Sequence, residues 1–213
     1  MKVLVFGATG PTGQWVLRQA LEAGHEVTAY ARSPAKLVPT APGLHVIAGE
    51  LTDAAAIRRA VAGQDAVISL LGPGGKSTGT PIADGMALIV QAMRSLGVRR
   101  LIATATTSAP DAKDRFSLPF WLAMHVVKAL AGSAYEEIVT TAAVVRESGL
   151  DWTLVRLPML SDKPCSRPAV AAHVGDPRIK LFSMSRERLA EFLVAQLSDS
   201  RWLGQSPAVS NGA

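Results

Sequence analysis

The chain begins with Lys2-Val3-Leu4-Val5-Phe6-Gly7-Ala8-Thr9-Gly10-Pro11-Thr12-Gly13, and this stretch decides the fold. The four consecutive apolar residues 3–6 predict a buried strand, and the apolar spacing of residues 15–21 predicts a helix from about Thr12. A glycine-rich turn joins the two elements. Gly7 would allow the tight turn, Gly10 would let a pyrophosphate approach the backbone, and Gly13 would let the helix pack close to the sheet. The alternative is a turn that only connects strand and helix.

Strand-like and helical segments alternate along the rest of the chain, which predicts βαβ units and a parallel sheet. The expected fold class is α/β, a Rossmann-like doubly wound parallel sheet with helices on both faces. The expected strands are residues 2–6, 27–31, 45–48, 66–71, 101–105 and 152–157, and the expected helices are residues 12–23, 54–61, 85–96, 135–148 and 186–197. We expect Asp53 and Ser185 to cap the second and last of these helices. Residues 158–178 are expected to form a long loop, and residues 206–213 a loose tail.

Composition favours one compact domain over residues 1–213, since 48% of the 213 residues are hydrophobic. The single Cys165 excludes an internal disulfide, so a cytoplasmic location is expected. No apolar stretch reaches the length of a membrane span, and the N-terminus predicts a strand, not a signal peptide. The net charge of +5 is scattered and accompanies no nucleic-acid motif, so it suits an anionic cofactor. The four histidines share no metal-ligand spacing, and we expect no metal.

The glycine turn also carries a family resemblance. Gly7-Ala8-Thr9-Gly10-Pro11-Thr12-Gly13 has the spacing GxxGxxG. This form resembles the atypical short-chain dehydrogenase/reductases, and in particular the NmrA-like group, which includes flavin reductase (biliverdin reductase B). The stretches Ala62–Ile68 and Val145–Thr153 fit the same group. The resemblance covers most of residues 1–160. It thins out over substrate-side segments at about 108–135 and 158–184, where such families bind their various substrates.

The end of the second expected strand indicates which cofactor is bound. In dinucleotide sites an acidic residue about twenty residues past the glycine turn holds the ribose hydroxyls. This chain has Arg32 there, followed by Ser33 and Lys36. A guanidinium, a hydroxyl and an ammonium suit a 2′-phosphate, which predicts NADP(H) over NAD(H). The alternative is that Ser33 caps a short helix beginning at Pro34, while the two cations are only solvated.

Further cofactor contacts are implied by the resemblance. They fall in the glycine turn and at the ends of later strands, where open α/β sheets bind ligands. With the residues already named for the turn and the 2′-phosphate, the expected cofactor set is Gly7, Thr9, Gly10, Pro11, Thr12, Gly13, Arg32, Ser33, Lys36, Glu50, Leu51, Leu71, Gly72, Pro73 and Pro158. Ordinary turns at these strand ends are the alternative.

The expected catalytic residues depart from the larger family, which uses a Ser and then a Tyr-x-x-x-Lys pair. Thr106 or Thr107 falls nearest the family's Ser. Tyr135 has Val139 in place of the Lys, so it lacks the cation that would activate its phenol as a proton donor. The resemblance therefore implies NADPH-dependent hydride transfer to a planar acceptor such as a flavin, quinone or bilin. The alternatives are an NmrA-like dinucleotide sensor without turnover, or a relative that uses the cofactor structurally.

Residues 116–125 hold three of the chain's eleven aromatic side chains and follow the fifth expected strand. We expect Phe116, Phe120, Trp121 and His125 to contact the substrate, because aromatic faces suit a planar acceptor. The alternative is an amphipathic helix that packs its apolar side on the core. The expected partner is a small-molecule acceptor, with no nucleic acid or membrane, and the chain is expected to be a monomer or homodimer.

Overall fold

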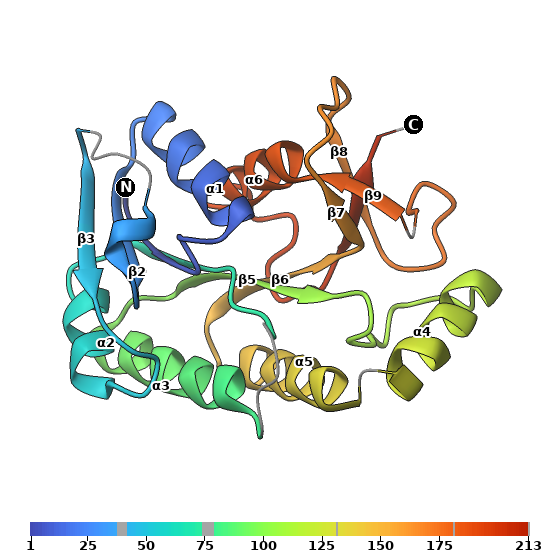
Figure 1. The fold of residues 1–213 in the computed structure, drawn as a ribbon, viewed down its shortest axis with the longest axis horizontal. Coiled ribbons are helices and arrows are strands. Elements are labelled where there is room, and N and C mark those ends of the chain that lie inside the picture. Colours follow the sequence, from blue (N-terminus) through green and yellow to red (C-terminus); the bar gives the residue numbers. More distant parts are fainter. Residues whose placement is uncertain (38–41, 74–78, 131, 181, 213) are drawn as a thin grey trace.

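The computed structural model describes residues 1–37, 42–73, 79–130, 132–180 and 182–212. An eight-stranded sheet has the order β3-β2-β1-β4-β5-β6-β10-β8 (Figure 1). All neighbours pair in parallel except β8 and β10. Its strands are β1 (Lys2–Phe6), β2 (Glu26–Ala31), β3 (Leu44–Ala48), β4 (Ala66–Ser69), β5 (Arg100–Thr106), β6 (Asp151–Leu157), β8 (Ala169–Ala172) and β10 (Ala208–Asn211). The predicted Rossmann-like α/β class is confirmed.

Helices cover both faces of this sheet (Figure 1). They are α1 (Pro11–Glu22), α2 (Ala54–Val61), α3 (Pro81–Leu96), α4 (Leu118–Leu130), α5 (Gly132–Arg146) and α6 (Arg186–Ala195). The pair α1 and α6 lies on one face, and α2, α3 and α5 lie on the other. A short 3₁₀ turn (Pro34–Lys36) follows β2, and a separate two-stranded sheet pairs β7 (Met159–Ser161) with β9 (Phe182–Ser185).

The continuous apolar run of β1 is explained by this layering. Side chains alternate across a strand. Leu4 and Phe6 belong to the core cluster that holds α2, α3 and α5 side chains. Val3 and Val5 belong to the cluster that holds α1 and α6 side chains. All four are fully buried, because a parallel strand covered on both faces has no solvent side.

Capping residues account for some of the helix ends that the sequence predicted. Asp53 caps α2 as predicted, accepting a hydrogen bond from Ala56 N at 2.9 Å. Ser185 stands at the N-cap position of α6, but its side chain makes no capping hydrogen bond. Gly97 ends α3 in the left-handed conformation, with φ of 73°.

Two predictions for the C-terminal third are wrong. Residues 206–213 were expected to be a loose tail, but residues 208–211 form β10, which pairs with β6 and β8. Val209 is fully buried, so this strand is part of the core. Residues 158–178 were expected to be loop, yet they contain β7 and β8. Short strands of this kind are stabilised by strand partners that are distant in sequence, which the local sequence pattern does not reveal.

Among the helices of the described residues, none is long and apolar enough to cross a membrane.

Candidate functional site: a dinucleotide-binding groove

The groove begins where the order of strands reverses, between the carboxyl ends of β1 and β4. Gly7 follows β1 with φ of 78°, and a Cβ there would lie 3.0 Å from the backbone carbonyl of Leu70. At Gly13 a Cβ would overlap the carbonyl oxygen of Gly7. These contacts agree with the predicted roles of Gly7 in the turn and of Gly13 in close packing, because larger residues do not fit either position.

Gly10 differs from its two neighbours in the motif. A Cβ at Gly10 would meet only Gly7 O, at an ordinary 3.4 Å, and its φ of −74° suits any residue. Gly10 is the N-cap of α1, which has no side-chain cap and no acidic residue in its first turn. The N–H groups at the start of α1 are therefore left for an anion, as in phosphate-binding helix termini. The described protein groups do not require glycine at position 10, whereas a bound phosphate would.

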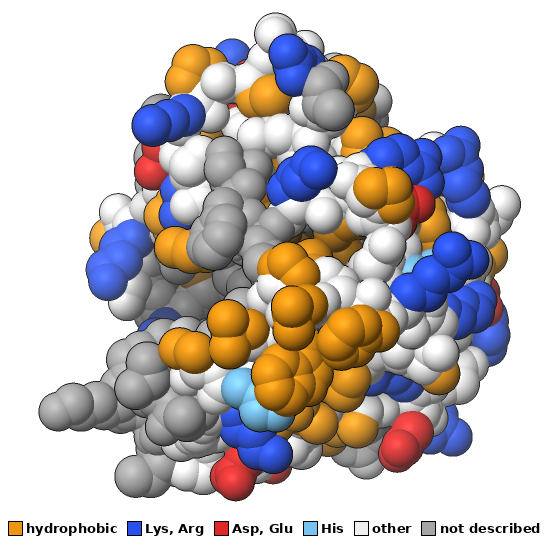
Figure 2. All heavy atoms as spheres, turned by 90° about the vertical axis from the view of Figure 1, so that its right-hand side faces the viewer, with side chains coloured by type: hydrophobic (Ala, Val, Ile, Leu, Met, Phe, Trp, Pro, Cys, Tyr) orange, Lys and Arg blue, Asp and Glu red, His pale blue; other side chains and the backbone are white. Residues whose placement is uncertain are grey.

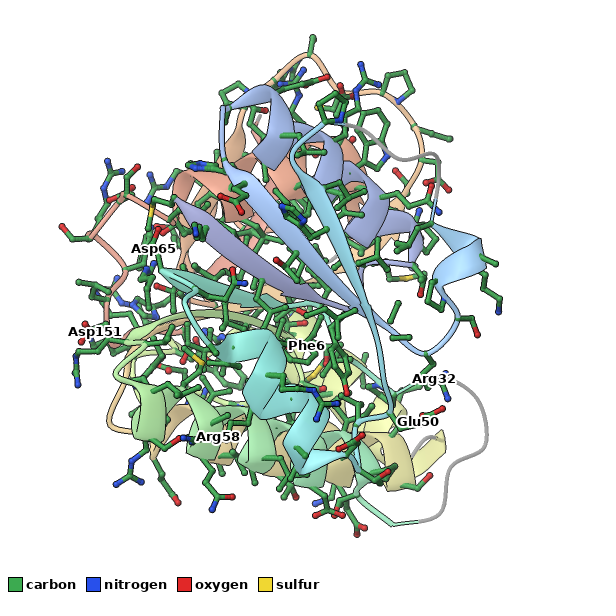
Figure 3. All side chains as sticks on the ribbon, turned by 90° about the vertical axis from the view of Figure 1, so that its left-hand side faces the viewer. Phe6, Arg32, Glu50, Arg58, Asp65 and Asp151 are labelled. Atoms are coloured by element: carbon green, nitrogen blue, oxygen red, sulfur yellow. The ribbon has the colours of Figure 1, made fainter. Side chains whose placement is uncertain are left out.

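A cavity of about 450 Å³ opens beside this turn, and we call it the outer cavity. Its walls come from the ends of β1, β2, β3 and β4 and from the start of α3. Eight residues of the predicted cofactor set line it: Gly7, Thr9, Gly10, Arg32, Glu50, Leu51, Leu71 and Gly72. Arg32 and Glu50 lie at the same end of the sheet, opposite the end that carries Asp65 and Asp151 (Figure 3). The groove therefore lies at the end of the sheet formed by the carboxyl ends of its strands, as the sequence predicted.

Tyr30 and Gly49 also line the outer cavity, and neither was in the predicted set. The Tyr30 ring packs on Phe6 with centroids 5.0 Å apart, and its hydroxyl donates to Glu50 O at 2.8 Å. A Cβ on Gly49 would overlap this hydroxyl. Burial, aided by the charges of Asp53 and Glu50, raises the pKa of Tyr30, so the hydroxyl remains a donor. Tyr30 thus fixes the backbone that forms one wall of the cavity.

The predicted 2′-phosphate residues lie together after β2. The exposed Arg32 lines the outer cavity, and its side chain has no hydrogen-bond or ion-pair partner among the described residues. Ser33 precedes the 3₁₀ turn that contains Lys36, but its side chain makes no capping hydrogen bond there. The Ser33 hydroxyl is therefore not used to cap the 3₁₀ turn, contrary to the alternative interpretation. All three residues are exposed, and of the three only Arg32 lines the outer cavity.

A smaller cavity of about 120 Å³ continues the groove toward β5, and we call it the inner cavity. It shares the lining residues Leu70, Leu71, Gly72 and Ile82 with the outer cavity, so the two cavities adjoin. Pro73 and Thr106 of the predicted set line it. The Thr106 and Ser108 hydroxyls are hydrogen-bonded to each other. The backbone N–H of Thr107 donates to Leu157 O at 3.1 Å, and Thr107 lies outside the walls of both cavities.

Several predicted residues lie near the groove without lining either cavity. Besides Thr107, they are Pro11, Thr12, Gly13, Ser33, Lys36 and Pro158. Sequence reasoning also missed cavity residues besides Tyr30 and Gly49. Of these, Ile82, Ile138 and Thr141 come from α3 and α5. The end of β2 could have indicated Tyr30, since ligands bind at strand ends. No sequence signal singles out Ile138 or Thr141, because their helix faces are known only once α5 is packed.

Tyr135 lies outside the walls of both cavities. A cation does approach it, although not from the position four residues on. Lys128 of α4 places its Nζ over the Tyr135 ring, 5.6 Å from the centroid. An ammonium over the ring face makes a cation–π contact, which holds the side chain without bonding to the phenol oxygen.

The four predicted substrate residues divide into two environments. Phe116, Trp121 and His125 are exposed, and the Trp121 and His125 rings lie 4.1 Å apart. They belong to a patch of exposed apolar side chains on and before α4 (Figure 2). Phe120 instead packs into a small core cluster with side chains from β8 and β10. For Phe120 the alternative of core packing therefore holds, and none of the four lines either cavity.

The fold and the groove together define a dinucleotide-binding protein of the Rossmann type. Residues 7–200 match the model of the NAD(P)H-binding family, and the chain belongs to that family. The chain is 30% identical over 156 residues to a (4-alkanoyl-5-oxo-2,5-dihydrofuran-3-yl)methyl phosphate reductase of Streptomyces griseus, covering 72% of this chain and 46% of the relative. It is 36% identical over 113 residues to a 2-alkyl-3-oxoalkanoate reductase of Stenotrophomonas maltophilia, covering 51% and 34%. The chain thus spans less than half the length of these relatives.

Solved structures share the fold over nearly the whole chain. A short-chain dehydrogenase/reductase from Veillonella parvula in complex with NADP superposes with a TM-score of 0.80 at 21% identity, covering 99% of this chain and 94% of that one. ChuY, an anaerobillin reductase from Escherichia coli O157:H7, has a TM-score of 0.80 at 18% identity, covering 99% and 97%. Both likenesses extend through the C-terminal third, where β8 and β10 complete the sheet.

Proposed function

We propose that the protein is an NADPH-dependent oxidoreductase of the atypical, NmrA-like type. It would transfer hydride to a planar small-molecule acceptor such as a flavin, quinone or bilin. The observation that carries the proposal is the pair of adjoining cavities at the carboxyl ends of the strands, the outer one lined by Arg32 and the inner one by Thr106. The reductase names of the curated relatives support the reaction class.

The preference for NADPH over NADH rests on Arg32, whose guanidinium is exposed at the open end of the groove. We expect Arg32→Ala to weaken NADPH binding by about 1.5–3 kcal/mol, the usual size of a hydrogen bond to a charged group. NADH affinity should change little, because NADH carries no 2′-phosphate. Titration calorimetry of both proteins with both cofactors measures this. Equal affinity of the unsubstituted protein for NADPH and NADH would contradict the proposal.

The chain's own residues would bind and orient the reactants and exclude water, while a bound nicotinamide cofactor would supply the hydride. The proton would come from water or from a weak hydroxyl such as Thr106. Thr107 remains a candidate from sequence, although its side chain is outside the inner cavity walls.

Tyr135→Phe should therefore lower kcat much less than the roughly 10²–10⁴-fold that general acid catalysis supplies. Steady-state rates of this variant are compared with those of Thr106→Val and Thr107→Val. A hundredfold loss in Tyr135→Phe at unchanged NADPH affinity would show that the phenol is the proton donor. Tight NADPH binding without turnover of any flavin, quinone or bilin would favour the sensor alternative.

A further inference from the structure

Helix α4 carries large apolar side chains on a face that points to solvent. Leu118, Trp121, Leu122 and Val126 are 61%, 49%, 58% and 49% exposed. Their spacing of three and four residues places them in one stripe along the helix. Phe116, which is 78% exposed, lies just before the helix. We call these five residues the α4 patch, and Figure 2 shows the apolar side chains gathered on this face.

The opposite face of α4 already has its partners within the fold. Phe120 is 7% exposed and packs with side chains of β8 and β10. The helix is therefore held to the core by a face other than the α4 patch. An exposed group of large apolar side chains of this kind is typical of a surface that binds a protein or a membrane.

The segment that carries the α4 patch is cationic. Residues 115–135 contain no Asp or Glu, whereas they include Arg115, His125 and Lys128. Lys128 is exposed and lies seven residues after Trp121, so it extends the same side of the helix by two turns. In Figure 2, Lys and Arg side chains flank the apolar side chains, and fewer Asp and Glu side chains appear on this face.

Arg115 stands at the start of this segment and is exposed. The charge of Arg115 helps to lower the pKa of Asp176, so this carboxylate lies near it. Asp176 is already paired with Arg178, at 2.8 Å. The net charge beside the α4 patch is therefore positive, and an anionic partner suits it.

This charge disfavours a second copy of the chain as the partner. In a two-fold dimer the same surface patch meets itself, so the cations of one copy would approach those of the other. Residues 115–135 supply no carboxylate to separate them. Like charges brought together across an interface cost free energy.

The α4 patch also offers few groups for the hydrogen bonds of a protein–protein interface, which has about one per 100–200 Å². The Nδ1 of His125 is already within 2.8 Å of Trp121 O. A bilayer requires no such bonds from the surface that enters it. Trp, Phe and Leu side chains insert at the boundary between headgroups and acyl chains, while Lys and Arg attract anionic headgroups.

We propose that the α4 patch docks the protein onto an anionic lipid surface. Its apolar side chains enter the headgroup boundary, and Arg115 and Lys128 lie among the headgroup phosphates. Docking of this kind needs no spanning helix, so it replaces the expectation of no membrane partner, which rested on the length of apolar stretches. The inference goes beyond the proposed function and is independent of it, since the α4 patch lines neither cavity.

The test measures binding of the 213-residue protein to lipid vesicles by co-sedimentation. Vesicles of phosphatidylcholine alone are compared with vesicles that also contain phosphatidylglycerol. We expect about tenfold tighter binding with phosphatidylglycerol, because each basic residue near an anionic surface adds to the attraction. Val126→Ser should weaken binding several-fold, whereas Val46→Ser should leave it unchanged. Val46 is the matched control, because it is 41% exposed and lies on β3, at the opposite edge of the sheet from β8.

Trp121 reports whether the α4 patch enters the lipid. Brominated acyl chains quench tryptophans that reach them, so binding to brominated vesicles should quench the protein's fluorescence. Trp121→Phe should bind nearly as well and lose most of this quenching. Arg115→Gln should weaken binding to the anionic vesicles, and Arg59→Gln, at an exposed position on α2, is its control. Thermal unfolding of each variant verifies that the fold is retained.

No binding to the anionic vesicles, equal effects of Val126→Ser and Val46→Ser, or unchanged quenching in Trp121→Phe would overturn the proposal. Sedimentation velocity tests for a second copy. A dimer that Val126→Ser dissociates, without any vesicle binding, would assign the α4 patch to self-association. Binding to soluble poly-glutamate as tight as binding to the vesicles would assign it to an acidic protein. Either of these two results would reject lipid docking.

Discussion

At the scale of single residues, two glycines three positions apart have different reasons to be glycine. At Gly13 the reason lies in the fold, because a Cβ would overlap the Gly7 carbonyl oxygen. At Gly10 the surroundings tolerate a Cβ, with the nearest atom 3.4 Å away. The two positions therefore separate folding from binding within one motif.

We expect Gly10→Val to fold with a melting temperature near that of the unsubstituted protein and to lose NADPH binding. A side chain there would push a phosphate away from the helix N-terminus. Gly13→Val should instead lower the melting temperature sharply, because α1 must move off the sheet. Calorimetry and NADPH titration of both variants give the comparison. Normal NADPH binding by Gly10→Val would mean that the glycine turn is only structural.

Arg156 is a buried cation with a defined set of partners. Its side chain is fully buried and forms two 2.6 Å hydrogen bonds to the Asp114 carboxylate. Further bonds go to Ser206 O at 2.8 Å and Ala109 O at 3.1 Å. The ion pair thus joins β6 to the segment after β5 and to the chain that leads into β10.

Asp114→Asn should destabilise the protein by about 3–5 kcal/mol, since it leaves a buried guanidinium without its counter-charge. The free energy of unfolding in urea measures the loss. Asp176→Asn is the control, because Arg178 is exposed and Asp176 is partly exposed, and solvent-accessible ion pairs contribute less than buried ones. Similar effects of the two substitutions would show that burial of Arg156 does not decide the energetics.

At the scale of elements, β10 shows how a short C-terminal segment enters the core. It lies between β6 and β8, parallel to one and antiparallel to the other. Val209 is 0% exposed and packs with the cluster that holds α1 and α6 side chains. The strand therefore contributes Val209 to the core on the side of the sheet that α1 and α6 cover, opposite the side that α5 covers.

Val209→Ala should cost about 2 kcal/mol of unfolding free energy, the scale of deleting buried methyl groups. Val46→Ala on β3 is the matched control, because Val46 is 41% exposed, and it should cost less than about 0.5 kcal/mol. Urea unfolding monitored by tryptophan fluorescence compares them. Equal costs would contradict the placement of β10 in the core.

At the scale of the whole molecule, stability should depend on acidic pH through carboxyl groups paired with arginine. A hydrogen bond from Arg178 lowers the pKa of Asp176 to about 2. A hydrogen bond from Arg99 lowers the pKa of Asp151. Burial alone would raise the pKa of Asp111, but hydrogen bonds and nearby arginine charges outweigh it and the net pKa is lowered.

In the unfolded chain these carboxyls titrate near their ordinary pKa of about 4. The unfolded state therefore takes up protons first as the pH falls. The stabilisation is fully present above about pH 4 and is lost progressively toward pH 2. Unfolding free energies in urea at several pH values should fall over this window, and the fall should be shallower in Asp176→Asn. A pH-independent free energy between pH 5 and 2.5 would contradict the prediction.

The sequence by itself determined the succession of the strands β1 to β6 along the chain, their doubly wound parallel class, the glycine turn and the end of the sheet that holds the groove. These follow from local signals: an apolar run, a helical spacing, and residues that mark helix boundaries, such as Asp53 at the start of α2 and Gly97 at the end of α3. Eight of the fifteen predicted cofactor residues line the outer cavity for the same reason, because strand ends are visible in sequence and share one edge.

Only the tertiary structure decided which distant residues meet. Tyr30 fixes Glu50 through a hydrogen bond across 20 positions, and Glu137 caps α3 from 54 or 55 positions away. The insertion of β10 beside β6 and the burial of Phe120 depend in the same way on segments far apart in the chain. Such contacts form when helices and strands pack against one another. The residues adjacent to a side chain in sequence therefore do not show which distant surface it will contact.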